Sequence, residues 1–263
     1  MRLFNNKKIE FLLKKLLNFS EALNLERRAK RYLKKNTERE IRILNLLIDE
    51  SKAAIDIGVY RGVYSYFLTK FSSFVYAFEA NPLLHSKLNS SFKNNKNIKI
   101  ENLAVSSGRG FTSLRIPIRD IEADYDDDQK YKLGIATIHS GNQLEDESFE
   151  TLDKIETISL DEYNFEHPIG FIKIDVEGHE LEILKGAKNL LETNKPNMII
   201  EIEERHSGVP REEIISYVKN IGYEVFYVNE KFQVMPVTNL DNVSIFYQNV
   251  LWFKISINDV FFM

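Results

Sequence analysis

The stretch IKIDVEGHELEILKGA, residues 172–187, passes from a short apolar run into an apolar pattern with helical spacing. Alternation in the run places Lys173 and Asp175 on the same side of a strand, and Gly178 permits a sharp exit from that strand. The apolar stripe of the following helix consists of Ile183, Leu184, Ala187, Leu190 and Leu191. The stretch therefore predicts a strand that ends in ionisable groups and leads directly into a helix, which we expect to reach about residue 193.

The same alternation of strand and helix extends to both sides of this stretch. Strand patterns occupy residues 53–58, 74–82, 97–105, 170–176, 197–203, 223–229 and 250–256. Helical spacing occupies residues 62–71, 83–92 and 210–221. This order predicts an α/β fold with a doubly wound, mostly parallel sheet that helices cover on both faces.

The regular order stops between residues 106 and 168. Short strand patterns at 111–117, 134–139 and 155–160 flank the acidic loop RDIEADYDDDQKY, residues 119–131. We expect antiparallel strands inserted after the third strand. The acidic loop lacks the alternating acids, the glycine and the final glutamate of an EF-hand, so we interpret it as a solvated lid.

Bulk properties exclude several classes of protein. The chain has 263 residues, is 43% hydrophobic and has a net charge of −4, which suits one large globular domain and disfavours a nucleic-acid partner that covers the whole surface. It has no cysteine, so disulfides and thiolate metal sites are excluded. The sequence has no run of about 18 apolar residues and no signal-peptide pattern, so we expect a cytoplasmic location.

The N-terminal segment differs in charge from the rest of the chain. Residues 1–35 carry 11 basic against 3 acidic residues, a net charge of +8, which leaves −12 for the remainder. Helical spacing runs through residues 1–50 with a break near residue 36, so we expect a basic helical extension, 1–50, before a domain at 51–263. The extension could pack on its own domain, pair in a homodimer, or lie on anionic lipid as a peripheral membrane contact through residues 1–35.

The loop DIGVYRGVYS, residues 56–65, joins the first strand to the first helix of the sheet. It has the spacing G-x-x-x-G, lacks the G-x-G-x-x-G pattern of dinucleotide sites and is not followed by a phosphate-binding lysine. Glu79 ends the second strand, where an acid can accept both hydroxyls of a ribose. The pair indicates a ligand with a ribose and no phosphate, of which S-adenosylmethionine is a common example; a plain tight turn is the alternative.

Four stretches together resemble the FkbM-type methyltransferases, a branch of the class I enzymes that use S-adenosyl-L-methionine. They are AIDIGVYRGVYS, VYAFEANP, FIKIDVEGHELEILKGA and KPNMIIEIE. TISLDEY, just before the third of these, is also similar to the family, and the resemblance covers roughly residues 53–205. It implies a Rossmann-like, seven-stranded sheet with the last strand antiparallel, and O-methylation as the usual activity. One departure is that Val59 and Tyr60 stand where the family usually has Ala-Asn.

The resemblance and the strand ends together assign the cofactor site. We expect S-adenosyl-L-methionine to contact Asp56, Gly58, Tyr60, Gly62, Glu79, Asn81 and Ala104. The expected reaction is methylation of a hydroxyl on a saccharide, a glycolipid or another small molecule. Two alternatives remain open: a nucleoside-binding module of the same fold that has lost its chemistry, and a peripheral membrane or scaffold protein that acts through its basic N-terminal helices.

Three ionisable residues after the fourth strand are the catalytic candidates. Asp175 lies at the carboxyl end of the strand and Glu177 and His179 follow it, at the edge where open α/β sheets bind ligands, and one of them could remove the proton of the acceptor hydroxyl. Glu177 could instead complement the helix dipole, and His179 could simply be exposed. We expect Lys173 to form an ion pair with a carboxylate. A metal site is disfavoured because a helix N-terminus is a poor place for a cation.

Overall fold

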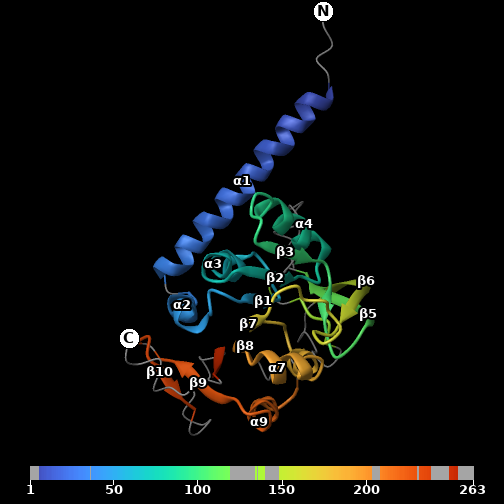
Figure 1. Ribbon diagram of the computed structural model, residues 1–263. Helices are drawn as coiled ribbons and strands as arrows, with labels where there is room; N and C mark the ends of the chain where they lie inside the picture. Colours follow the sequence, from blue (N-terminus) through green and yellow to red (C-terminus); the bar gives the residue numbers. More distant parts are fainter. Residues whose placement is uncertain are drawn as a thin grey trace, which may run out of the picture.

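A computed structural model describes residues 6–35, 37–118, 134, 136–139, 148–202, 208–229, 231–237 and 249–253 (Figure 1). Side chains are described for all of these except residues 6–20 and 249–253. The acidic loop 119–131 lies outside the described residues.

The central sheet is mostly parallel, as predicted. The described part contains eight strands in the order β10 (Val234–Pro236), β9 (Glu224–Val228), β11 (Asn249–Phe253), β8 (Asn197–Glu201), β7 (Ile169–Ile174), β1 (Ala53–Ile57), β2 (Phe74–Phe78) and β3 (Ile98–Glu101). The pairs that join β8, β7, β1, β2 and β3 are parallel, whereas β11 runs antiparallel to both β8 and β9. The expected antiparallel last strand is therefore confirmed, and β10 adds a short antiparallel edge strand that we did not predict.

Two sets of helices cover the two faces of this sheet. One face packs against α6 (Glu180–Lys185), α7 (Lys188–Asn194) and α9 (Arg211–Asn220). The other packs against α3 (Val63–Phe71) and α4 (Pro82–Ser91), together with the N-terminal helices. The single helix expected up to residue 193 is in fact two helices, because Gly186 separates α6 from α7; a side chain at Gly186 would collide with the Ser106 carbonyl oxygen, so the turn requires glycine.

A small second sheet stands after β3. It contains β4 (Ala104–Val105), β5 (Gly110–Pro117) and β6 (Phe149–Ile158), in the order β4-β6-β5. The strand expected at 97–105 is therefore divided between two sheets, and the strand expected at 155–160 is longer and begins at Phe149. The strand expected at 134–139 is not formed in its described part, where Thr137 makes only an isolated bridge with Arg115.

The N-terminal segment forms α1 (Asn6–Lys35), the 3₁₀ helix η1 (Arg39–Ile43) and α2 (Leu44–Leu47), with the break near residue 36 that we expected. Figure 1 shows α1 running along α3 and α4 and continuing past the body of the domain. Leu25 and Ala29 of α1 are buried against this body, as are Leu44 and Leu47 of α2. The second half of the predicted extension thus belongs to the core. Among the described residues, no helix has the length and apolar character needed to cross a membrane.

Candidate active site

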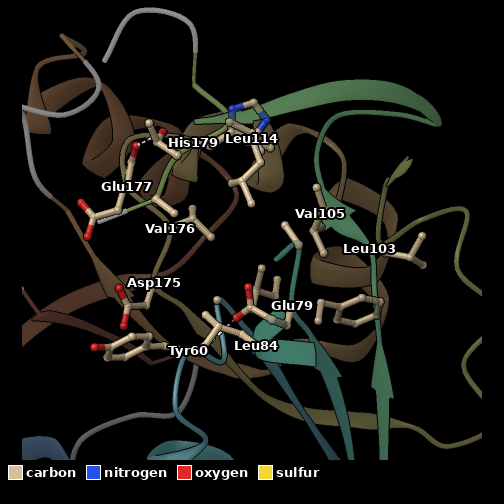
Figure 2. Close-up of a pocket in the computed structure, with 18 of the residues that line it drawn as sticks. Tyr60, Glu79, Leu84, Leu103, Val105, Leu114, Asp175, Val176, Glu177 and His179 are labelled. Atoms are coloured by element: carbon tan, nitrogen blue, oxygen red, sulfur yellow. Dashed lines mark hydrogen bonds between the residues drawn. The ribbon is translucent and has the colours of Figure 1, made fainter. Parts of the chain in front are cut away.

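A cavity of about 110 Å³ opens at the carboxyl ends of β1, β2 and β7, between the two sheets. Its walls include Gly58, Tyr60, Glu79, Leu103, Ala104, Val105, Leu114, Thr137, Asp175, Glu177 and His179. Figure 2 shows the Glu79 carboxylate with Tyr60 and Asp175 on one side and the apolar Leu103 and Val105 on the other. The cavity therefore has a polar end and an apolar end that meet at Glu79.

The loop after β1 turns tightly because of its two glycines. Gly58 and Gly62 both have φ of 79°, in the left-handed region that glycine adopts without penalty. A side chain at Gly58 would collide with the carbonyl oxygen of Asp175, so this glycine lets the ends of β1 and β7 lie in contact. Tyr60, between the glycines, has φ of 51°, which is uncommon for a residue with a side chain.

Glu79 is held by the backbone on both of its oxygens. Oε2 accepts a hydrogen bond of 2.8 Å from the Tyr60 N–H, and Oε1 accepts one of 2.9 Å from the Asn81 N–H. Burial raises the pKa of Glu79 to about 7, although these two hydrogen bonds favour its charged form. A carboxylate oxygen accepts more than one hydrogen bond, so both oxygens still have capacity toward the cavity.

The other four residues expected at the cofactor differ in their placement. Ala104 lines the cavity. Asp56 is fully buried behind it and accepts a hydrogen bond of 2.5 Å from the Ser65 hydroxyl. Asn81 caps α4, because its side-chain oxygen accepts from the Leu83 N–H at 2.9 Å. Asp56 and Asn81, like Gly62, are not among the residues that line the cavity, so the structure places these three behind its wall.

A network of buried charges surrounds Asp175 at the polar end. Lys173 is only 2% exposed, and its Nζ lies 2.6 Å from Oδ2 of Asp175, which is the ion pair that we expected. The Lys173 ammonium also lies 4.5 Å from the centre of the Tyr64 ring. Although burial alone would lower the pKa of Lys173, the charges of Asp175 and Asp56 raise it, so the lysine is held in its charged form.

Glu201, at the end of β8, also belongs to this network. Burial, followed by the charge of Asp175, raises the pKa of Glu201 to about 9, and the two carboxyl groups share a hydrogen bond. The raised pKa favours the protonated form of Glu201 near neutral pH, and this form can donate a hydrogen bond to the Asp175 carboxylate. Strand alternation in the sequence can place Glu201 in this network. Ile199 and Glu201 lie on the same face of β8, and Lys173 lies on the corresponding face of the neighbouring strand β7. No comparable signal marked Tyr64, which lies at the start of a helix.

The three catalytic candidates do not converge on one point. Figure 2 shows the Glu177 carboxylate directed away from the centre of the cavity and His179 beyond Val176, far from Tyr60. Nε2 of His179 lies 2.9 Å from the Ser106 hydroxyl, and burial lowers the pKa of His179 to about 4. Asp175 alone of the three stands at the polar end beside Tyr60. The described residues contain no group of three or more His, Asp or Glu side chains arranged to hold a metal ion.

A family model described as the methyltransferase FkbM domain matches residues 56–225. The structure of a methyltransferase FkbM from Methylobacillus flagellatus aligns with a TM-score of 0.47 and 15% identity over 78% of this chain, which spans 44% of that protein. A candidate methyltransferase of Streptococcus mutans, solved in complex with S-adenosylhomocysteine (SAH), aligns with a TM-score of 0.45 and 14% identity, over 81% of this chain and 94% of that one. A comparison with curated proteins gave no match.

Proposed function

Because the chain belongs to the FkbM methyltransferase family, we propose that it transfers the methyl group of S-adenosylmethionine to a hydroxyl oxygen of a saccharide, a glycolipid or another small molecule. The observation that carries this proposal is the position of Glu79, a buried carboxylate that two backbone N–H groups fix at the junction of a polar and an apolar half-cavity.

The residues of the cavity suit the nucleoside part of this cofactor. Glu79 would accept the two ribose hydroxyls, and the apolar side chains of Leu103, Val105 and Leu114 would contact the adenine. Gly58 lines the cavity, and its lack of a side chain lets the ends of β1 and β7 meet at this edge. When bound, the cofactor supplies an electrophilic methyl group on a sulfonium sulfur, and the polar end of the cavity is the place where an acceptor would meet it.

Asp175 is the residue that we assign to the acceptor hydroxyl. It lines the cavity beside Tyr60, and its carboxylate is oriented by Lys173 on one side and by Glu201 on the other. As the acceptor oxygen bonds to the methyl carbon and the carbon–sulfur bond breaks, Asp175 would take the hydroxyl proton while the bond's electron pair stays on sulfur. Fixing the hydroxyl in line is the larger contribution, since positioning is worth up to about 7–11 kcal/mol and a placed base about 10²–10⁴-fold in rate.

Glu177 and His179 are less suited to this role. The His179 Nε2 is already in contact with Ser106, and an imidazole with a pKa of about 4 is a weak base at neutral pH. The Glu177 carboxylate points away from the cavity, and its backbone carbonyl accepts a hydrogen bond of 2.6 Å from Thr137. We therefore propose that these two residues shape the wall and that Asp175 performs the proton transfer.

A nucleoside-binding module without turnover is the second candidate. The observation in its favour is Tyr60, whose ring lines the cavity and whose backbone has a positive φ at a position where the family usually has asparagine. Such a module would bind the cofactor or SAH in the same way and would transfer no methyl group.

A methyl-transfer assay separates the two functions. The purified protein is mixed with S-adenosylmethionine labelled in the methyl group and a panel of hydroxylated saccharides and glycolipids, and labelled products are identified by mass spectrometry. The methyltransferase proposal expects a labelled ether on a hydroxyl oxygen, formed by the wild type and much more slowly by Asp175→Asn. SAH binding together with no labelled product across extracts of the source cells would favour the binding module.

A further inference from the structure

A second, smaller pocket lies directly behind Tyr60. Helix α1, the Tyr60–Arg61 loop and helix α4 enclose it, and its walls include Glu21, Arg28, Tyr60, Arg61, Leu84 and Lys87. Tyr60 and Leu84 line both this pocket and the cofactor cavity, so the two spaces share a wall. The small pocket has no role in the methyl transfer described above.

The walls of this pocket are positively charged. They carry the three cationic side chains of Arg28, Arg61 and Lys87, and Glu21 is the carboxylate among these described lining residues. Burial and, next, the positive charge of Arg61 lower the pKa of Arg28, and the opposing effect of Glu21 is smaller than either. The guanidinium groups of Arg28 and Arg61 therefore face the same half-buried space, and their positive charge is only partly neutralised by Glu21. A bound anion would stabilise this arrangement.

Both guanidinium groups are held in place. Nη1 of Arg28 donates a hydrogen bond of 3.0 Å to the carbonyl oxygen of Arg61, which fixes the side chain of α1 against the loop. The Arg61 guanidinium carbon lies 5.2 Å from the centre of the Tyr60 ring. A guanidinium has five N–H donors in a rigid plane, so one bond to a carbonyl leaves Arg28 with four others for an oxyanion.

The size of the pocket limits the ligand. Its volume is about 40 Å³. One buried water needs roughly 10–15 Å³ on the same measure. The pocket therefore has room for a single small oxyanion and not for a sugar ring or a nucleobase.

We propose that this pocket binds one phosphate or carboxylate group between the guanidinium groups of Arg28 and Arg61. The shared chemistry is that of a small oxyanion, which arginine recognises through paired N–H donors. The oxyanion could be free phosphate or a group carried by an acceptor, or it could be the carboxylate of a ligand that also fills the cofactor cavity. This proposal does not depend on methyl transfer, since a protein without turnover would present the same pocket.

The site is tested by titrating the full-length protein with inorganic phosphate while sodium chloride keeps the ionic strength constant. Thermal unfolding at each phosphate concentration reports binding. The wild type should unfold at a higher temperature in phosphate than in chloride alone, with a saturating response. Arg28→Gln and Arg61→Gln should each raise the apparent dissociation constant for phosphate about tenfold. Arg31→Gln, which removes an exposed arginine one turn from Arg28 in α1, is the matched control and should respond like the wild type.

Arg61→Lys covers the case in which Arg61→Gln fails to fold, because it keeps the charge and removes the paired donors; it should show weakened phosphate binding. An equal response of the wild type to phosphate and chloride, or an unchanged response in folded Arg28 and Arg61 variants, would overturn the proposal. The same phosphate titration in the presence of saturating SAH distinguishes the possible sources of the oxyanion. Loss of the phosphate response would identify the carboxylate of the bound ligand as the natural occupant, and its persistence would identify free phosphate or an acceptor group.

Discussion

The backbone N–H of Tyr60 donates a hydrogen bond of 2.8 Å to Oε2 of Glu79. This bond joins two motifs that lie 19 residues apart, the glycine loop after β1 and the acid at the end of β2. It also helps to hold Tyr60 at a φ of 51°, a conformation that costs on the order of 1–3 kcal/mol for a residue with a side chain. The loop is therefore fixed in its ligand-facing form by the same carboxylate that we assign to the ribose.

The contact between Gly58 and Asp175 gives a first prediction. Gly58→Ala should destabilise the protein by on the order of 2–4 kcal/mol, because it adds a methyl group against the Asp175 carbonyl oxygen at a positive φ. Gly108→Ala is the control, since a methyl group there would meet no atom within 4 Å. Urea unfolding of both variants measures the difference. A Gly58 variant as stable as the control would show that the two strand ends are further apart than described.

Packing of α1 on the domain gives a second prediction. Leu25→Ala should lower the free energy of unfolding by about 2–5 kcal/mol, the range for a leucine in a packed core, since Leu25 is 2% exposed. Leu46→Ala removes the same atoms from a side chain that is 57% exposed and should change stability by less than about 0.5 kcal/mol. Equal stability of the two variants would mean that α1 is a separate arm.

The sequence predicted the architecture well where one local pattern decides one element. Strand patterns at 53–58, 74–82 and 170–176 correspond to β1, β2 and β7, and the antiparallel last strand follows from the family resemblance. The burial of Leu25 was not predictable from charge, because an excess of basic residues in a helix gives no information about what its apolar side chains pack against. The division of residues 97–105 between two sheets depends on β6, which begins more than forty residues later.

The site was predictable in its position and less so in its geometry. Strand ends placed Gly58, Glu79 and Asp175 at one edge, and all three line the cavity. Asp56 and Asn81 share those strand ends, yet their side chains are used by Ser65 and by the start of α4. Such local hydrogen bonds depend on side-chain directions in three dimensions, which spacing along the chain does not determine.

The arrangement of the three acid–base candidates gives a third prediction. On a verified acceptor, Asp175→Asn should lower kcat by about 10²–10⁴-fold and leave SAH affinity nearly unchanged, because the lost interaction strengthens only in the transition state. Glu177→Gln is the matched control and should keep kcat within a few-fold, as its carboxylate points away from the cavity. Full turnover in the Asp175 variant with loss in the Glu177 variant would reverse the assignment.

Glu180 gives a fourth prediction, on the pH dependence of stability. Burial raises the pKa of Glu180 from 4.5 to about 8, so its contribution to stability is full below pH 4.5 and is lost as the pH rises toward 8. Over that window the wild type loses up to about 1.4 kcal/mol per pH unit through this group. Glu180→Gln does not ionise, so its melting temperature relative to the wild type should increase between pH 5 and pH 8.

Glu182→Gln is the control for this pH experiment. Glu182 lies two residues further along α6 and pairs with Lys185 at 2.7 Å, and this hydrogen bond lowers its pKa. Its stabilising contribution is present above the ordinary carboxyl pKa and is lost in acid, so its replacement should bring no gain at alkaline pH. A relative melting temperature of the Glu180 variant that stays flat with pH would show that Glu180 is ionised in the folded protein.

The most direct test of the cofactor site is calorimetric titration of SAH into the wild type, Glu79→Gln and Glu50→Gln, the last at an exposed carboxylate away from the cavity. We expect the wild type and the Glu50 variant to bind SAH equally and the Glu79 variant to bind it roughly 10–100-fold more weakly, the loss for a hydrogen bond to a charged group. Undetectable binding to the folded wild type, or equal affinity in all three proteins, would show that Glu79 does not hold the ribose.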